Sequence, residues 1–250
     1  MRRLAWATLA LGAGACAVTP LTNKIAPGED PFVVAIGEGP GGETDLFAAN
    51  TAGGPFVRFT FTRRAERLAR LAPSGAALAF LRDRTDRDST ALDLVVMNLL
   101  NASERRVEVP ATLGRPTGLG WSKDGRRLYL TGVGGSLVSE APPAPLALAP
   151  TDRGAADSAV AELLGEPAYA RVERCGPVVC LVTVDGDTTP LPADTREAIR
   201  WTADSVGLLR GSEIEIRPLG GGRLRRPTLA SVPTGLRSIS HHAGASDTLR

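Results

Sequence analysis

Trp121-Ser122-Lys123-Asp124-Gly125, followed by Leu128-Tyr129-Leu130, is the stretch that decides the fold. The Asp124-Gly125 pair predicts a tight turn, because glycine tolerates positive φ and aspartate stabilises turns. The apolar run after the turn is typical of an inner strand. The stretch therefore predicts a strand ending at Trp121, a hairpin turn and a second strand, with the indole packed between neighbouring sheets.

The same arrangement occurs at two other places in the chain. Leu71–Gly75 precedes an apolar run at Leu78–Phe80, and Trp201–Ser205 precedes Leu208-Leu209. The first positions of these units are separated by 50 and 80 residues. Repetition at a period of about 40 residues is typical of propellers. The longer interval predicts one more unit near Arg171–Val182, with its turn at Gly176.

These segments resemble the WD40-like repeat of TolB-type bacterial propellers, whose consensus approximates W-S-P-D-G followed by an apolar strand. The match is close at Trp121–Leu130. It is partial elsewhere, since the first unit lacks Trp and Asp and the third has Ser205 in place of glycine. The resemblance implies an all-β propeller over residues 32–250. At about 40–45 residues per blade, this length predicts about five blades; six short blades and an incomplete ring stay open.

Short strands are expected along the whole of this region. Strand patterns separated by turn residues occur at Val57–Thr62, Leu78–Leu81, Leu92–Leu100, Val107–Val109, Val178–Val184 and Ile214–Arg217. The stretch Arg63–Ala72 fits either a helix or a strand. Only Ala155–Leu164 has a helical pattern, ended by Gly165 and Pro167, and it predicts one short helix inserted in a loop.

The first fifteen residues have the three parts of a secretory signal peptide. Arg2 and Arg3 form a positive start, Leu4–Gly12 is mostly apolar, and Ala13–Ala15 supplies small residues for cleavage. The apolar stretch is shorter than the roughly 20 residues needed to span a bilayer. The chain is therefore expected to be exported, with residues 16–31 as a Pro- and Gly-containing tether to the folded domain.

Ala13–Cys16 resembles the lipobox of bacterial lipoproteins, although Ala13 stands where Leu is commonest. The resemblance implies a lipid attached to Cys16 and retention on the periplasmic side of the envelope. Ala17 is not the Asp associated with inner-membrane retention, so an outer-membrane anchor is expected. The alternative is cleavage after Ala15 and release of a soluble protein.

The chain has two further cysteines, Cys175 and Cys180, on either side of a Gly-Pro turn. Lipidation of Cys16 leaves this even pair, and an exported protein meets an oxidising compartment. A disulfide across the turn is therefore expected, with two free buried thiols as the alternative. A metal site is not expected, because two thiols without a nearby His are too few ligands.

The charge balance favours no partner class. Without Arg2 and Arg3 the 29 basic residues become 27, equal to the 27 acidic ones. A nucleic-acid-binding domain needs a basic excess, so no nucleic acid is expected as a partner.

No sequence motif for a specific catalytic or ligand-binding chemistry is complete. Gly37–Gly42 matches G-x-G-x-x-G but lacks the following helix, which favours a loop. The only two histidines, His241 and His242, lie in a polar segment expected to be a C-terminal tail. A calcium site at Asp83, Asp86 and Asp88 is disfavoured by the arginines that alternate with them. No catalytic residue, metal or cofactor is therefore assigned.

Three functions stay open. The leader, the repeats and the missing catalytic set favour an envelope-anchored, non-enzymatic propeller that binds a protein or a glycan. An enzyme that uses the central channel is the second hypothesis. The third is an orphan propeller resembling the accessory domain of prolyl-oligopeptidase-type peptidases.

Overall fold

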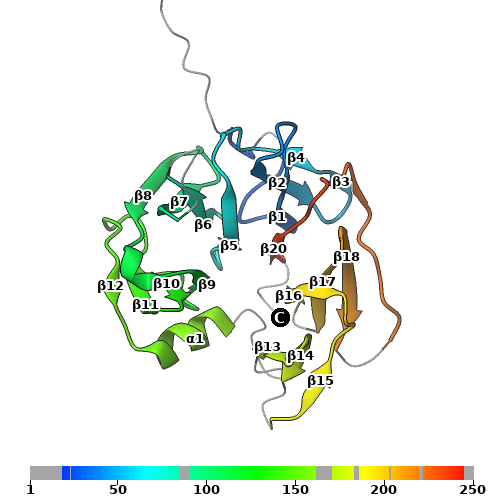
Figure 1. Cartoon of the computed structure of the whole chain (residues 1–250). Coiled ribbons are helices and arrows are strands. Elements are labelled where there is room, and N and C mark those ends of the chain that lie inside the picture. The colour runs from blue at the N-terminus through cyan, green and yellow to red at the C-terminus, as the bar shows by residue number, and fades with distance from the viewer. Residues whose placement is uncertain are drawn as a thin grey trace, which may run out of the picture.

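The structure is a computed structural model that describes residues 19–22, 24–84, 90–161, 171–182, 186–202, 204–219 and 222–244. Within them, five sheets of three or four strands are arranged around a common axis (Figure 1). The expected all-β propeller with one short helix is confirmed. None of the described helices is long and apolar enough to cross a membrane.

The first three sheets have four strands each. Sheet 1 has the order β20-β1-β2-β4, with β20 at Ser238–His242, β1 at Phe32–Glu38, β2 at Thr44–Asn50 and β4 at Val57–Arg58. Sheet 2 contains β5 at Glu66–Leu71, β6 at Ala77–Asp83, β7 at Leu92–Asn98 and β8 at Glu104–Glu108. Sheet 3 contains β9 at Pro116–Trp121, β10 at Arg127–Gly132, β11 at Gly135–Glu140 and β12 at Ala149–Pro150.

The last two sheets have three strands each. Sheet 4 contains β13 at Arg171–Cys175, β14 at Val178–Val182 and β15 at Thr188–Pro190. Sheet 5 contains β16 at Thr195–Thr202, β17 at Ser205–Arg210 and β18 at Glu213–Pro218, and Arg225 bridges to Ile216 beside β18. In the described part of the chain, sheets 1, 2 and 3 therefore have a fourth strand, sheet 5 has a single bridge residue in that place, and sheet 4 has three strands.

Two short elements lie outside the five sheets, besides a 3-10 turn at Ala111–Leu113. β19 at Leu229–Ala230 pairs in parallel with β3 at Gly54–Pro55. The helix α1 at Arg153–Ala161 follows sheet 3, where a helix was expected over Ala155–Leu164. The last residues of that expected range lie outside the described part.

Apolar clusters join neighbouring sheets around the ring. Sheets 1 and 2 share a cluster that includes Val34 and Phe80, and sheets 2 and 3 share one that includes Leu94 and Trp121. Two further clusters join sheet 5 to sheet 1 and to sheet 4. Between sheets 3 and 4 the helix α1 contacts both β9 and β13. In the described part, apolar side chains therefore connect neighbouring sheets, and α1 lies between sheets 3 and 4.

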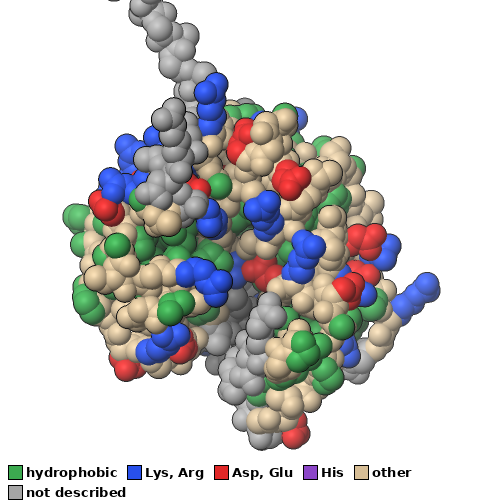
Figure 2. All heavy atoms as spheres, viewed as in Figure 1, with side chains coloured by type: hydrophobic (Ala, Val, Ile, Leu, Met, Phe, Trp, Pro, Cys, Tyr) green, Lys and Arg blue, Asp and Glu red, His purple; other side chains and the backbone are tan. Residues whose placement is uncertain are grey.

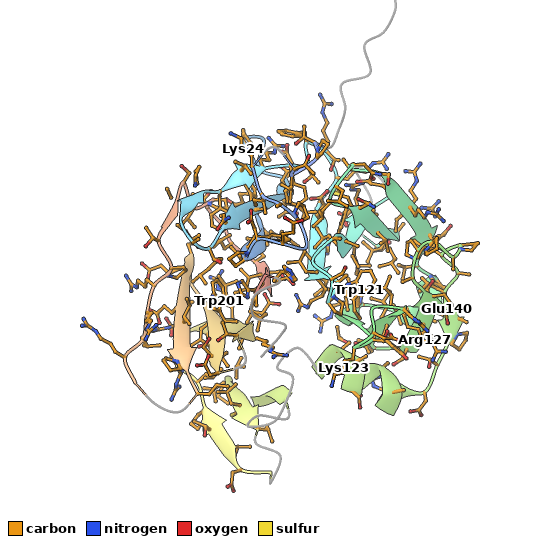
Figure 3. The ribbon with its side chains drawn as sticks, turned by 180° about the vertical axis from the view of Figure 1, so that it is seen from behind. Lys24, Trp121, Lys123, Arg127, Glu140 and Trp201 are labelled. Carbon is orange, nitrogen blue, oxygen red and sulfur yellow. A yellow bond between two sulfur atoms is a disulfide. The ribbon has the colours of Figure 1, made fainter. Side chains whose placement is uncertain are left out.

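The repeat signal in the sequence is confirmed at both tryptophans. Trp121 ends the inner strand β9 and Trp201 lies near the end of the inner strand β16, and both are buried between sheets (Figure 3). Trp121 Nε1 donates a hydrogen bond of 3.0 Å to the carbonyl oxygen of Arg70 in sheet 2. Trp201 stacks on His241 of sheet 1, with ring centroids 4.0 Å apart. Each indole therefore fixes the contact to a neighbouring blade.

The ring closes by pairing the two ends of the chain. β20 is antiparallel to β1, with a register from Phe32 opposite His242 to Ile36 opposite Ser238. The expectation that His241 and His242 belong to a polar tail is therefore wrong. Ser238, Ile239 and Ser240 are buried in this strand, because both faces of an inner strand meet other blades.

The expected tether over residues 16–31 is corrected in its described part. The amide of Thr19 donates to the carbonyl oxygen of Phe59 at 2.9 Å. Leu21 and Ile25 are buried in the cluster between sheets 1 and 2. Two apolar side chains thus draw the segment onto the blades, and the folded unit begins before Phe32.

The remaining expectations concern loops and one ambiguous stretch. Gly37–Gly42 forms the end of β1 and the turn before β2, as the loop interpretation predicts. The stretch Arg63–Ala72 contains a strand, β5, and no helix. Strand pairing over Val57–Thr62 is limited to β4 and one bridge residue. Asp83 is buried and pairs with Arg67, whereas Asp86 and Asp88 lie outside the described residues.

Candidate functional site

The structure describes two of the three predicted site residues, Cys175 and Cys180. Cys16 is outside the described residues. Cys175 ends β13 and Cys180 lies in β14, so they flank one hairpin turn, with their sulfur atoms facing each other and Cα atoms 5.9 Å apart. This separation is within the usual range of about 4.4–6.8 Å for disulfides. The geometry supports the disulfide, which stays a prediction.

A buried ion pair near the propeller axis was not anticipated from the sequence. Arg70 of β5 and Glu197 of β16 meet across β20, with Nη2 2.7 Å from Oε1. Their side chains are 8% and 16% exposed. Arg70 Nη1 also donates to Ser238 Oγ at 3.1 Å, and the amide of Ile239 donates to Glu197 Oε2 at 2.6 Å. The pair therefore holds the C-terminal strand between sheets 2 and 5.

Irregularities in two inner strands aim these side chains at each other. The register of β5 shifts between Arg67 and Arg70, and the intervening Leu68 has φ of 51°. The register of β16 shifts between Thr195 and Glu197. A bulge re-aims the side chains next to it, and a non-glycine residue at positive φ is uncommon. Both bulges thus serve the closure of the ring.

A second buried network joins sheets 1 and 2. Glu66 accepts hydrogen bonds from Arg82 Nη2 at 2.9 Å and Thr60 Oγ1 at 2.7 Å, and Arg82 also reaches Glu104 at 2.7 Å. Burial raises the pKa of Glu66 to about 7, against the opposing charge of Arg82. Because the Glu66 carboxylate is fully buried, this network braces the blades and offers no docking surface.

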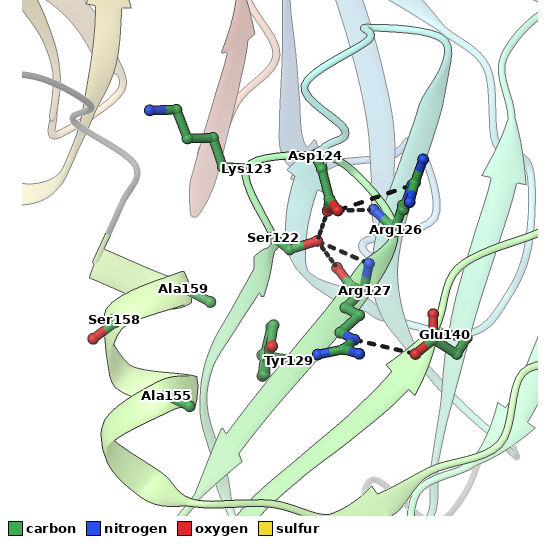
Figure 4. A pocket seen from close by; sticks show the side chains of 10 residues that line it. All are labelled: Ser122, Lys123, Asp124, Arg126, Arg127, Tyr129, Glu140, Ala155, Ser158 and Ala159. Atoms are coloured by element: carbon green, nitrogen blue, oxygen red, sulfur yellow. Dashed lines mark hydrogen bonds and ion pairs between the residues drawn. The ribbon is translucent and has the colours of Figure 1, made fainter.

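A hollow on the described surface lies beside α1, between the helix and the β9–β10 turn (Figure 4). It is open to solvent and has a volume of about 770 Å³. This volume lies within the range of roughly 300–1,000 Å³ typical of ligand pockets. Its lining residues are Ser122, Lys123, Asp124, Arg126, Arg127, Tyr129, Glu140, Ala155, Ser158 and Ala159. We call this cavity the turn–helix hollow; part of the stretch that decided the fold lines it.

One wall of the turn–helix hollow is a chain of hydrogen bonds. Ser122 Oγ donates to Asp124 Oδ1 at 2.6 Å and accepts from the amide of Arg127 at 2.9 Å. Arg127 Nε lies 3.1 Å from Glu140 Oε1 on the neighbouring strand, because the register places these residues opposite each other. Arg127 and Tyr129, two apart on β10, point to the same face. The polar groups are thus held before any ligand arrives.

The other wall is α1, which packs closely against β9 because β9 has two glycines at the contact. A Cβ on Gly120 would lie 2.7 Å from the carbonyl oxygen of Ala159, and one on Gly118 would lie 2.7 Å from Val160 Cγ1. The helix therefore packs directly on the backbone of the inner strand. This contact sets the distance between the helix and Tyr129, and hence the width of the hollow.

Hydrogen bonds favour the ionised forms of two exposed groups of the hollow, Asp124 and Arg127. The hydrogen bond from Ser122 lowers the pKa of Asp124. Hydrogen bonds with Tyr129 and then Glu140 raise the pKa of Arg127 above its usual range. Within the described residues, no group of three or more metal-ligating side chains occurs.

The surface around the ring carries both signs of charge. Figure 2 shows acidic and basic side chains interspersed on one face, with several Lys or Arg side chains near the centre. Figure 3 shows Lys123, Arg127 and Glu140 close to α1, away from Trp201. These charged residues of the hollow therefore lie on the α1 side of the ring, away from Trp201.

No protein-family model matches the chain, and no curated protein matches it. The solved structures similar to it include TolB from Acinetobacter baumannii, with 12% identity and a TM-score of 0.45 over 87% of this chain and 56% of that one. A TolB structure from Agrobacterium tumefaciens has 15% identity and a TM-score of 0.36, over 78% and 60%. The propeller domain of the Trilobed protease from Pyrococcus furiosus has 14% identity and a TM-score of 0.31, over 79% and 55%.

This chain spans a little over half the length of the two TolB structures. Identities and TM-scores of this size concern the propeller fold alone.

Proposed function

We propose that this chain is a non-enzymatic binding propeller of the bacterial cell envelope, and that its protein or glycan partner docks in the turn–helix hollow. One observation carries the proposal: the hollow is open, and its polar wall is already hydrogen-bonded. Groups held in place before binding lose less entropy when a ligand arrives. Binding is what this arrangement favours.

The protonation states of the hollow support binding over catalysis. General acid–base catalysis works best with a pKa near the operating pH. The pKa of the Asp124 carboxyl is lowered, and Glu140 is paired with Arg127. The Ser122 hydroxyl is engaged with Asp124 and with the backbone of Arg127. These lining groups suit recognition of a partner.

A channel enzyme has less support. The axial charges of Arg70 and Glu197 neutralise each other and bind the backbone of β20. Groups engaged in this way hold the fold together, and moving them to act on a substrate would open the ring.

The proposed location in the cell envelope rests on the expected signal peptide and on Cys16 directly after it. A lipid on Cys16 would anchor the propeller on the periplasmic side, at the outer membrane if Ala17 has the expected effect. Fractionation of cells that produce wild type and Cys16→Ser tests this anchor. Wild type is expected with the membranes and the variant in the soluble periplasmic fraction; a soluble wild type with an unmodified Cys16 contradicts the anchor.

The docking part is tested by filling the hollow. Ser158 is an exposed lining residue on α1, so Ser158→Arg places a long side chain in the hollow without disturbing the core. Thr112→Arg, at an exposed position outside the hollow, is the matched control. The purified chains are immobilised and exposed to envelope extract, and bound protein and carbohydrate are both measured. A ligand retained by wild type and Thr112→Arg but lost in Ser158→Arg is expected; equal retention by all three contradicts docking in the hollow.

A further inference from the structure

The described chain starts on the outer edge of the ring, between sheets 1 and 2 (Figure 1). The amide of Thr19 donates to the carbonyl oxygen of Phe59, directly after β4, at 2.9 Å. The amide of Leu21 donates to the carbonyl oxygen of Leu99, directly after β7, at 3.3 Å. The side chain of Leu21 is buried between the two sheets. The position of Thr19 is therefore fixed relative to both blades.

Two large apolar side chains are exposed beside this point. Phe61 comes two positions after Phe59 and is 45% exposed, and Leu100 comes directly after Leu99 and is 47% exposed. The guanidinium carbon of Arg58 lies 4.8 Å from the centroid of the Phe61 ring. A cation–π contact of this kind is attractive, so it holds the ring at the surface. Phe61 and Leu100 thus flank the start of the described chain, one on each blade.

The length of chain before Thr19 limits how far this edge can stand from a lipid anchor. Cys16 precedes Thr19 by three positions. Three residues span at most about 11 Å even when fully extended. A lipid on Cys16 inserts into the bilayer, so it brings the edge with Thr19, Phe61 and Leu100 to the membrane surface. We call these three residues the exit edge.

Basic side chains lie near the exit edge. Lys24 is exposed, and its amide donates to the carbonyl oxygen of Leu21 at 2.8 Å. Figure 3 shows Lys24 on the same edge of the ring. Arg63 is exposed two positions after Phe61. Apolar side chains at an interface enter the boundary between headgroups and acyl chains, while Lys and Arg reach the headgroups. The exit edge has both kinds of side chain.

We propose that the exit edge lies against the membrane, with Phe61 and Leu100 inserted into the lipid interface. The helix α1 is on the far side of the ring from this edge (Figure 1), so the turn–helix hollow faces away from the lipid and is accessible to a partner. This inference rests on the proposed lipid anchor and adds the orientation of the propeller on the membrane.

Tryptophan fluorescence of the lipid-bearing full chain tests the orientation. Phe61→Trp and Leu100→Trp each place an indole at the exit edge, and Trp also keeps the contact with Arg58. Each protein is reconstituted into vesicles of phosphatidylethanolamine and phosphatidylglycerol, with and without brominated acyl chains. Trp121 and Trp201 are buried in the protein, so wild type is the blank. Both variants should lose more fluorescence than wild type on brominated vesicles, and their emission should shift to shorter wavelength.

Val133→Trp is the matched control. Val133 lies in the turn between β10 and β11 of sheet 3 and is 68% exposed, more than Phe61 or Leu100. Its indole should lose no more fluorescence than wild type, because this turn does not belong to the exit edge. Circular dichroism of each variant shows that the substitution leaves the fold intact.

The mass of each purified chain shows whether Cys16 has its lipid, which separates two kinds of failure. In lipid-bearing, vesicle-bound protein, any other pattern overturns the inference and leaves the anchor: no quenching at Phe61→Trp or at Leu100→Trp, or equal quenching at Val133→Trp. If Cys16 is unmodified and the chain does not bind vesicles, the anchor and the inference fail together. Docking in the turn–helix hollow is then still decided by Ser158→Arg.

Discussion

Replacing Glu197 by Gln removes one charge of the axial ion pair and changes little else. The side chain keeps its shape, and its amide still offers an oxygen to the backbone of Ile239. Arg70, whose side chain is 8% exposed, is left without a counter-charge. Because water reaches it poorly, the lost charge is not replaced by solvation.

The expected cost follows from this burial. Removing one partner of a buried ion pair typically destabilises a protein by about 3–5 kcal/mol. Glu197 is 16% exposed, which places the expected loss for Glu197→Gln near the lower end, at about 3 kcal/mol. The double variant Arg70→Met/Glu197→Leu should recover much of it, since a buried pair replaced by apolar residues of similar size is often neutral.

Urea unfolding followed by circular dichroism measures these differences. Glu140→Gln is the matched control, because the Arg127–Glu140 pair has a similar 3.1 Å contact but side chains 57% and 58% exposed. Exposed pairs contribute about 0–1 kcal/mol, so this variant should unfold nearly as wild type. If Glu197→Gln costs no more than Glu140→Gln, the axial pair does not hold the ring together.

Three further predictions concern stability and covalent structure. Trp121→Ala removes a buried indole between sheets 2 and 3 and should cost about 3–5 kcal/mol in urea unfolding; a cost below that of a surface substitution would contradict its place between the blades. Burial lowers the pKa of His241 from 6.5 to about 3, so the unfolded chain takes up a proton at this residue first, and the contribution of His241 to stability should fall as pH drops from about 6.5 toward about 3, by at most about 1.4 kcal/mol per pH unit. The raised pKa of Glu66 has the opposite effect in wild type and in a His241 variant alike. The fall is measured as the urea midpoint at several pH values, and His241→Phe should flatten it; an equal fall in both proteins means that other groups cause it. Non-reducing mass spectrometry should find the peptide with Cys175 and Cys180 lighter by two hydrogens, and alkylation of both thiols without reductant would refute the disulfide.

Local patterns in the sequence predicted the blades but not their closure. The Trp121 and Trp201 units are visible because a tight turn between two strands needs particular residues at neighbouring positions. Arg70 and Glu197 lie 127 positions apart, and no local pattern links them. Their burial also depends on bulges in β5 and β16, which strand alternation does not predict.

Two errors came from composition. The sequence around His241 and His242 resembles a tail because it is polar, yet inner-strand serines bind the groups of neighbouring blades, as Ser238 does with Arg70. Residues 19–31 resembled a tether because their apolar residues are sparse, yet Leu21 and Ile25 suffice to dock the segment. The turn–helix hollow was missed for a related reason: α1 follows Trp121 by about thirty residues, and only the two glycines of β9 indicate that it packs there.

Hydrogen–deuterium exchange of the intact chain tests most directly whether the C-terminal strand closes the ring. The amides of β20 pair with β1 from Phe32–His242 to Ile36–Ser238, and the surrounding side chains are buried. A peptide covering Ser238–His242 should therefore be protected as strongly as one covering β1, and both should lose protection together in Glu197→Gln. Exchange of Ser238–His242 at the rate of an unstructured chain, with β1 still protected, would contradict a closed propeller.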